Sequence, residues 1–355
     1  IRSYMKYGIN YHDLSCESDI AHDVDLEKIL KDNIDSAFDL FNGPLIRVMV
    51  IDLSAEQSIF SLCASHLVVD GWSLEKIMEE VCGNYTAIIQ GRYYDAPALP
   101  KLHDYFVELD TKKSNGDIEL AERFWLSRYT NLPPTMVLPH DHARPPLKTY
   151  KGQRFEYQIQ GGVVNQLRSV AKDANSTVFV VLLSAFYLLL NRLSGEDDVV
   201  VGIPAAGQPH LGLLRLCTHM VSFLPVRIKS DPALSFSDFL QTVNDEFIEA
   251  KDNQDVGYGQ LLKILAIHRD PSRLPLLATC FNMDMPYNEI VFNGVKADFM
   301  ATPRGFVKYD LYFNVTDLGD RFSLEIDFNC DLFDRESVDQ WVEHYEGICH
   351  AISEK

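Results

Sequence analysis

The sequence is poor in positive charge and lacks paired cysteines. Among its 355 residues, 32 are lysine or arginine and 51 are aspartate or glutamate, which gives a formal net charge of −19 at pH 7. A surface this acidic repels phosphate and no basic run offsets it, so nucleic acid is excluded as an expected partner. The seven cysteines are dispersed, without Cys-x-x-Cys spacing, which predicts neither a zinc site nor a disulfide framework. Reduced thiols of this kind indicate a cytoplasmic location.

Long apolar runs and targeting segments are also lacking. The most apolar stretch, residues 178–190, is too short to span a bilayer. Asn175 and Ser176 precede it as candidate caps and Gly195 follows it, so it is expected to form a buried core helix. No signal peptide is visible at the start of the chain. We therefore expect no contact with a membrane.

Patterns that bind metals or phosphate are lacking as well. The closest histidine pair, His140-x-His142, lies in a proline-rich segment without a further ligand at metal-binding spacing. The other histidines outside the pattern described below, His219 among them, carry no supporting pattern, and no phosphate-binding glycine loop is found. We expect no metal and no cofactor of the chain's own.

What the sequence does contain is an alternation of strand-like and helix-like segments. A chain of 355 residues exceeds the usual size of one core, which favours two lobes. The segment 131–146, rich in proline, is interpreted as a linker, so the lobes are predicted at residues 1–140 and 141–355. The elements follow no regular βαβ period, which indicates α/β sandwiches with mixed sheets. Predicted strands lie at 44–53, 58–65, 152–160, 198–203, 220–229, 277–283, 307–315 and 322–329, and predicted helices at 25–38, 73–90, 119–129, 163–173, 178–193, 236–252 and 335–352.

One histidine stands at a chain reversal. His66 ends a predicted strand, and Asp70-Gly71 leads into a predicted helix with Ser73 as its expected N-cap. An imidazole is the side chain that most readily accepts a proton near neutral pH, so His66 is a candidate base. The alternative is a structural histidine beside an ordinary Asp-Gly turn.

Residues 65–73, Ser-His-Leu-Val-Val-Asp-Gly-Trp-Ser, resemble a known signature. The signature is the His-His-x-x-x-Asp-Gly of the condensation domain of nonribosomal peptide synthetases, followed there by Trp-Ser. Further segments resemble those of the family in the same order: 38–45, 103–105, 124–125, 200–207, 221–227, 269–276 and 331–334. The resemblance covers nearly the whole chain.

The resemblance implies the fold of the chloramphenicol acetyltransferase superfamily. In that α/β fold (an α+β sandwich), two lobes form a V-shaped pseudo-dimer around a central channel. The chain opens after the family's first two motifs, so the first lobe is expected to lack its opening segment.

The resemblance also implies a reaction. A donor acyl or aminoacyl thioester is joined to the amine of an acceptor aminoacyl thioester, and both are tethered to carrier proteins through 4'-phosphopantetheine. The implied partners are the donor and acceptor peptidyl carrier proteins and the neighbouring synthetase domains. The thioester is already activated, so the protein needs mainly to position the two substrates and manage one proton.

Site residues follow from the signature. His66 is the candidate that accepts the proton of the attacking amine or positions that amine. Asp70 is expected to hold an arginine and lock the loop, with Arg47, Arg273 and Arg304 as candidates. The alternative is that Asp70 only caps the helix that follows.

Four further residues complete the predicted site. The amide of Gly71 is a candidate donor to an oxyanion. Ser65, which stands where the family has its first histidine, is a candidate substrate contact. Trp72 is another, as is Ser222, which stands where relatives often carry asparagine; core packing is the alternative for Trp72 and Ser222.

Two other functions stay open. One is a module of the same fold that recruits partners without catalysis, which Ser65 and the absent opening segment favour. The other is a stand-alone acyltransferase that uses acyl-coenzyme A, although the order of the late segments favours the carrier-dependent enzyme. A heterocyclising relative would carry aspartate in place of the signature histidines, and the sequence has none there.

Overall fold

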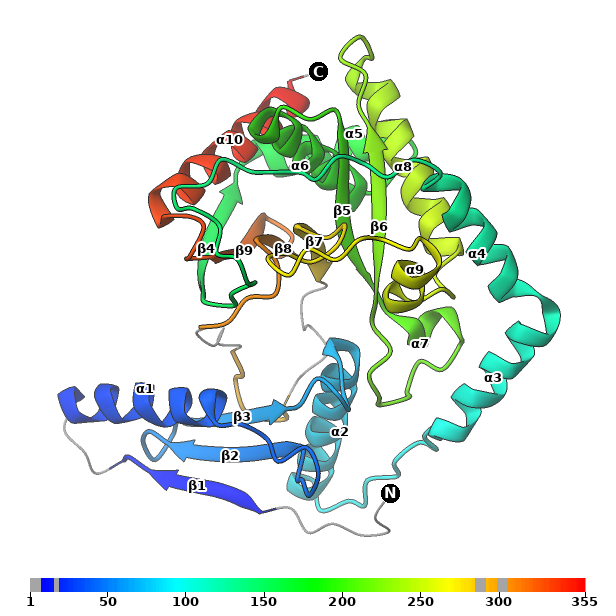
Figure 1. Cartoon of the computed structure of the whole chain (residues 1–355). Helices are drawn as coiled ribbons and strands as arrows, with labels where there is room; N and C mark the ends of the chain where they lie inside the picture. Colours follow the sequence, from blue (N-terminus) through cyan, green and yellow to red (C-terminus); the bar gives the residue numbers. More distant parts are fainter. Residues whose placement is uncertain (1–7, 16–18, 285–291, 299–304, 355) are drawn as a thin grey trace. The chain divides into compact units, whose positions relative to one another are not determined.

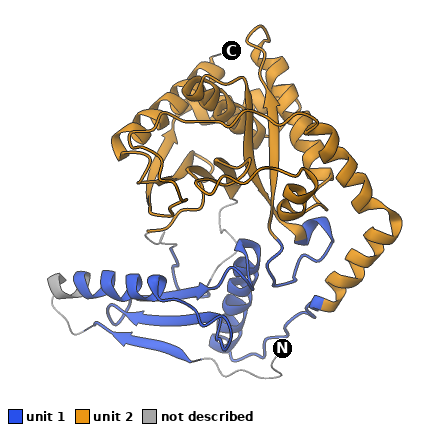
Figure 2. Cartoon of the chain, in the orientation of Figure 1, with its two compact units in different colours: residues 1–102, 208–220, 289–303 blue, residues 103–207, 221–288, 304–355 orange. Residues whose placement is uncertain are grey.

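The computed structural model describes residues 8–15, 19–284, 292–298 and 305–354. Contacts divide the chain into two compact units, which Figure 2 colours separately. Unit 1 consists of residues 1–102, 208–220 and 289–303, and unit 2 of residues 103–207, 221–288 and 304–355. Each unit is thus assembled from segments that are far apart in the sequence.

Unit 1 contains a three-stranded mixed sheet (Figure 1). Strand β1 (Ile9–Asp13) runs parallel to β2 (Ile46–Asp52), which pairs antiparallel with β3 (Ser58–Ala64). The polar turn 54–57 joins β2 to β3, as the sequence predicted. There the backbone carbonyl of Gln57 accepts two hydrogen bonds, at 2.9 and 3.1 Å.

Two helices accompany this sheet. Helix α1 (Asp19–Asp35) lies alongside it, and its apolar residues pack against the small core formed by Leu14, Met49 and Ile51 (Figure 1). Helix α2 (Gly71–Ile89) follows β3 and begins two residues earlier than predicted.

The expectation that Ser73 caps α2 is wrong. The N-cap is Asp70, whose side chain accepts the backbone N–H of Ser73 at 2.9 Å. A carboxylate three residues before that N–H has the usual N-cap geometry. Ser73 is therefore a buried residue of the first turn.

Unit 2 is built on a six-stranded sheet, and its mixed character was predicted. Its strand order is β4-β9-β8-β7-β5-β6. The pairs β4–β9, β8–β9 and β5–β6 are antiparallel, and β5–β7 and β7–β8 are parallel. The strands are β4 (Gly152–Gln160), β5 (Asp198–Ala205), β6 (Ser222–Lys229), β7 (Thr279–Asp284), β8 (Leu311–Asp317) and β9 (Arg321–Asn329).

Four helices pack against one another beside this sheet (Figure 1). They are α5 (Gly162–Asp173), α6 (Val178–Ser194), α8 (Phe236–Asp252) and α10 (Arg335–Ser353). The apolar stretch predicted as a core helix is α6, and it is buried among the other three. Its N-cap is Thr177 rather than the predicted Asn175 or Ser176, because the Thr177 hydroxyl accepts the Val180 N–H at 3.3 Å.

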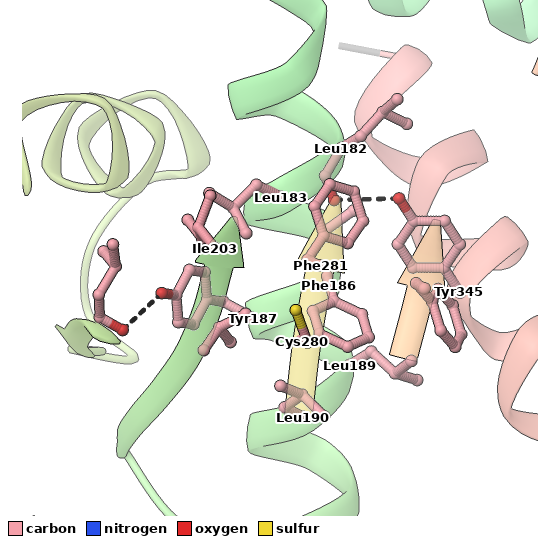
Figure 3. Packing of buried hydrophobic residues seen from close by; sticks show 14 of the residues in the cluster. Leu182, Leu183, Phe186, Tyr187, Leu189, Leu190, Ile203, Cys280, Phe281 and Tyr345 are labelled. Atoms are coloured by element: carbon pink, nitrogen blue, oxygen red, sulfur yellow. Dashed lines mark hydrogen bonds between the residues drawn. The ribbon is translucent and has the colours of Figure 1, made fainter. Parts of the chain in front are cut away.

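Aromatic side chains fill the core of unit 2 around α6 (Figure 3). Phe186 packs against Phe281 of β7, with ring centroids 5.3 Å apart. Tyr345 of α10 donates its hydroxyl hydrogen to the Leu182 carbonyl at 3.0 Å. Tyr187 donates in the same way to the carbonyl of Val226 in β6 at 2.8 Å. Each of these two buried hydroxyls thus has an acceptor, which avoids the cost of an unpaired polar group.

The remaining helices were predicted less well. Helix α3 (Leu102–Asn115) was missed; it has no buried residue, so its apolar positions form no clear stripe. Helix α4 (Asp117–Arg128) begins two residues before the predicted 119–129. The short helices α7 (Gly207–His210) and α9 (Tyr258–Ile264) were not predicted.

The predicted linker 131–146 has no helix or strand, but it contributes Met136 and Leu138 to the core of unit 2. Contacts group residues 103–140 with unit 2. The lobe boundary at residues 140/141 stays a prediction.

Within the described ranges, no single helix is long and apolar enough to cross a membrane. Helices α5 and α6 reach that length only as a pair, and the pair is bent by 104°.

Candidate functional site

His66 lies in the turn between β3 and α2, as the sequence predicted. The turn is fixed by backbone hydrogen bonds: Ser65 donates to the Leu45 carbonyl at 2.9 Å, and Val68 donates to the Ser65 carbonyl at 3.1 Å. The imidazole is exposed in this structure. A histidine on a short, hydrogen-bonded turn has a defined position and an accessible ring.

Asp70, four residues later, is buried and accepts hydrogen bonds from three residues. Its Oδ1 accepts from the backbone N–H and the hydroxyl of Ser73, at 2.9 and 2.7 Å. Its Oδ2 accepts from the backbone N–H of Met220 at 2.9 Å, and the Gln208 amide lies 3.1 and 3.2 Å from the two oxygens. Asp70 thus joins the start of α2 to the segment 208–220.

Two opposing effects act on the Asp70 carboxylate. Burial by itself raises its pKa, because the charged form loses contact with water. The hydrogen bonds from Met220, Ser73 and Gln208 outweigh burial and lower the pKa below its ordinary value of 3.8. The side chain is therefore an anion at neutral pH, held by neutral donors.

The predicted arginine partner of Asp70 is wrong for two of the three candidates. Arg47 donates to a backbone carbonyl at 2.7 Å and lies 4.0 Å from the Phe38 ring centroid. Arg273 pairs with the aspartate three residues before it, at 2.9 Å. Arg304 lies outside the described residues. Asp70 does cap the helix, as the alternative had it, but that is not its only role, because donors of segment 208–220 also bind the carboxylate.

A second histidine meets His66. The Nδ1 atoms of His66 and His219 lie 3.1 Å apart, and the two rings meet edge to face at an angle of 86° with centroids 4.9 Å apart. No sequence pattern singled out His219, which is 153 residues away along the chain. Its position just before the family-like segment 221–227 was the one available signal.

Trp72 and Gly71 open α2. The Trp72 indole N–H donates to the Leu214 carbonyl at 2.8 Å, so this side chain also holds the segment 208–220. Gly71 is exposed, and a Cβ atom built on it would meet no atom within 4 Å. As the first helical residue, Gly71 has a backbone N–H without an intrahelical acceptor.

Ser65 and Ser222 occupy different units. The Ser65 hydroxyl accepts the Leu67 N–H at 3.4 Å, a local turn contact. Ser222 is the first residue of β6 in unit 2, half-buried and opposite Ala205 of β5. Ser65, His66, Asp70, Gly71 and Trp72 all belong to unit 1.

Unit 1 also contains a largely apolar cavity of about 510 Å³ along α2. Arg215, from the segment 208–220, forms an ion pair with Glu80 at its lining. The lining residues are Lys76, Ile77, Glu80, Val81, Asn84, Tyr85, Ile88, Leu99, Arg215 and Cys217. Across the part of the chain that the structure describes, no group of three or more histidine, cysteine or acidic side chains is arranged to hold a metal ion.

Comparison with known proteins gives one family and many relatives. The condensation domain family model matches residues 1–355. The chain is 30% identical over 325 residues to tyrocidine synthase 3 of Brevibacillus parabrevis, covering 89% of this chain and 5% of the synthase. It is 30% identical over 319 residues to gramicidin S synthase 2 of Brevibacillus brevis, covering 89% of this chain and 7% of that synthase. The chain thus spans a small part of the length of these relatives.

Solved structures show the same fold at low sequence identity. The X-domain from teicoplanin biosynthesis superposes with a TM-score of 0.83 and 18% identity, covering 98% of this chain and 79% of that one. The condensation domain of the monacolin K polyketide synthase gives a TM-score of 0.82 and 19% identity, covering 99% and 80%. The predicted α/β fold class is confirmed, because the chain shares its fold with these two domains.

Proposed function

Because this chain belongs to the condensation domain family, whose members are acyltransferases that form amide bonds, we propose that it joins two thioester-bound substrates. The donor is an acyl or aminoacyl thioester, and the acceptor is an aminoacyl thioester with a free amine. The family match over the whole chain carries this proposal. The exposed imidazole of His66 on its hydrogen-bonded turn supports it.

The reaction requires one proton transfer. The amine nitrogen attacks the thioester carbon, a C–N bond forms, and the C–S bond breaks with release of a thiol. His66 takes the proton from the amine and returns it to the leaving sulfur, or it holds the amine by a hydrogen bond while the oxyanion is stabilised elsewhere.

Asp70 and Gly71 act beside His66 in this proposal. Asp70 is a positioning residue, since its oxygens are occupied by hydrogen bonds that fix the turn. The N–H of Gly71, at the positive end of the α2 dipole, is the candidate donor to the oxyanion. Substrate contacts of Ser65, Trp72 and Ser222 stay predictions; for Trp72, the hydrogen bond to Leu214 supports the packing alternative.

Carrier proteins are the proposed partners. The two synthases compared above are far longer than this chain, which covers 5% of one and 7% of the other. Neighbouring domains therefore supply the substrates on 4'-phosphopantetheine arms in this proposal. The proposed location is the cytoplasm, in keeping with the dispersed cysteines.

The test is a reconstituted transfer between a loaded donor carrier and a loaded acceptor carrier. His66→Ala is expected to lower the transfer rate by about 10²–10⁴-fold, the usual contribution of a general base. The exposed His268→Ala is the matched control and should transfer like the parent. Undiminished transfer by His66→Ala would contradict the proposed role.

A recruitment module is the second candidate, because Ser65 replaces the first histidine of the signature. A domain of this fold is also found bound to another protein, in a complex of the X-domain with OxyB. That structure has a TM-score of 0.78 and 18% identity, covering 98% of this chain and 77% of that one. If the parent chain binds a carrier protein but transfers no acyl group, recruitment is favoured. If it accepts a donor from acyl-coenzyme A alone, the stand-alone acyltransferase is favoured.

A further inference from the structure

The contact between His66 and His219 restricts the protonation state of both rings. Two Nδ1 atoms 3.1 Å apart form a hydrogen bond only when one carries a hydrogen and the other a lone pair. If His66 is the donor, its own lone pair is on Nε2. If His219 is the donor, neutral His66 carries its hydrogen on Nε2 and cannot accept a proton there.

His219 is held in place from both sides. The residue after it, Met220, donates its N–H to Asp70, and the residue before it, Thr218, donates its N–H to the Ser73 hydroxyl at 3.1 Å. The Ser73 hydroxyl in turn donates to Asp70. The carboxylate that caps α2 therefore also fixes the backbone on both sides of His219.

The side-chain hydrogen bond of Ser65 is not with the His66 ring, so another residue orients that ring. The Ser65 hydroxyl accepts a hydrogen bond from the Leu67 backbone at 3.4 Å, within its own turn. Among the described residues, His219 is the side chain that is hydrogen-bonded to the His66 ring. In this part of the chain, the task of orienting the imidazole therefore falls to His219 and not to the position where the signature has its first histidine.

We infer that His219 is a positioning residue for the proposed amide-forming reaction, on which this inference rests. His219 accepts a hydrogen bond from the Nδ1–H of His66, which leaves the Nε2 lone pair of His66 to take the amine proton. The imidazolium formed in this way keeps its Nδ1–H bond to neutral His219, a charge-assisted hydrogen bond. The proton then passes from Nε2 to the sulfur of the leaving thiol.

Two variants of the full chain test this role. In His219→Asn the side-chain oxygen can still accept from His66, whereas in His219→Phe the ring fills the space without an acceptor. Nitrogen NMR of the imidazoles is expected to show His66 with its hydrogen on Nδ1 in the parent and in His219→Asn. In His219→Phe, the fraction of His66 that carries its hydrogen on Nδ1 should fall.

The kinetics should follow the tautomer. His219→Phe is expected to lower kcat by about 10–100-fold, as loss of a group that orients a histidine does elsewhere, with KM for both carriers nearly unchanged. His219→Asn should recover most of that loss, and the exposed His268→Phe serves as the control.

The outcomes separate the two claims. If the parent transfers and His219→Phe transfers equally well, or if the His66 tautomer is the same in both, the inference is overturned and the proposed function stands. If the parent shows no transfer at all, the proposed function fails, and the inference fails with it.

Discussion

Asp70 Oδ2 accepts the backbone N–H of Met220 at 2.9 Å across 150 residues of sequence. The two residues meet because the segment 208–220 packs with unit 1, although strands β5 and β6 on either side of it belong to unit 2. One carboxylate therefore serves both as the N-cap of α2 and as the anchor of a distant segment.

Replacing that carboxylate should loosen the segment. In Asp70→Asn, an NH₂ group faces one of the N–H donors, so we expect a cost of about 1–3 kcal/mol for the unpaired buried groups. Amide hydrogen exchange should become faster at Thr218 and Met220, whose N–H groups depend on this network. The exposed Asp95→Asn is the control, and unchanged exchange at Met220 in Asp70→Asn would contradict the anchoring role.

The pH dependence of the contact between Asp70 and Met220 follows from the direction in which the pKa of Asp70 is shifted. The pKa of Asp70 is lower in the folded chain than its ordinary 3.8, so its hydrogen bonds contribute stability above that pH. The contribution is lost as the pH falls below 3.8 and the carboxylate takes up a proton. The difference in Met220 exchange between the parent and Asp70→Asn should be constant from about pH 7 to 5 and shrink below about pH 4. A difference that vanishes already at about pH 5 would show that another group controls the segment.

Close packing around Gly152 in unit 2 leaves no space for a side chain. A Cβ atom on Gly152 of β4 would lie 2.2 Å from Cγ1 of Val307, a buried side chain. Gly152→Ala should therefore lower the free energy of unfolding by about 1–3 kcal/mol, the usual cost of overpacking. Chemical denaturation measures the loss, and the double variant with Val307→Ala should recover part of it.

Gly162→Ala is the matched control for that experiment. Gly162 is the first residue of α5, and a Cβ atom there would meet nothing within 4 Å. Its stability should equal or exceed that of the parent, because alanine favours the helix. Equal losses in the two variants would rule out the contact with Val307 as the cause.

The substitution Gly71→Ala is expected to change the transfer rate without changing the stability of the fold. The Cβ position of Gly71 is open in this structure, so Gly71→Ala should fold with a melting temperature close to that of the parent. If the Gly71 amide approaches the substrate, the added methyl group should lower kcat/KM for transfer by about 10-fold or more, because the oxyanion donor is displaced. Transfer at the parent rate would exclude that approach.

Much of the fold could be predicted because periodicity is local. Strand β4 and helix α8 have the bounds that their patterns predicted, since alternation and helical spacing are readable within each segment. Helix α3 was missed because none of its residues is buried, so packing left no stripe in its sequence.

The candidate site was predicted only in its local part. The placement of His66 after a strand and of Asp70 before a helix follows from adjacent residues. The partners of these two side chains, His219 and Met220, lie 153 and 150 residues away along the chain. No local sequence pattern predicts that their segment contacts the turn that carries His66 and Asp70. The expectations for Arg47 and Arg273 as partners of Asp70 were wrong for the same reason.

Because unit 1 consists of three segments that are separate in the sequence, its parts become available at different times during translation. When residues 1–102 have left the ribosome, Asp70 can already cap α2, but Met220 and His219 have not been synthesised. The environment of His66 is therefore completed only after β5 has been made, and a fragment cut after residue 102 would carry the signature without the residues that hold its histidine.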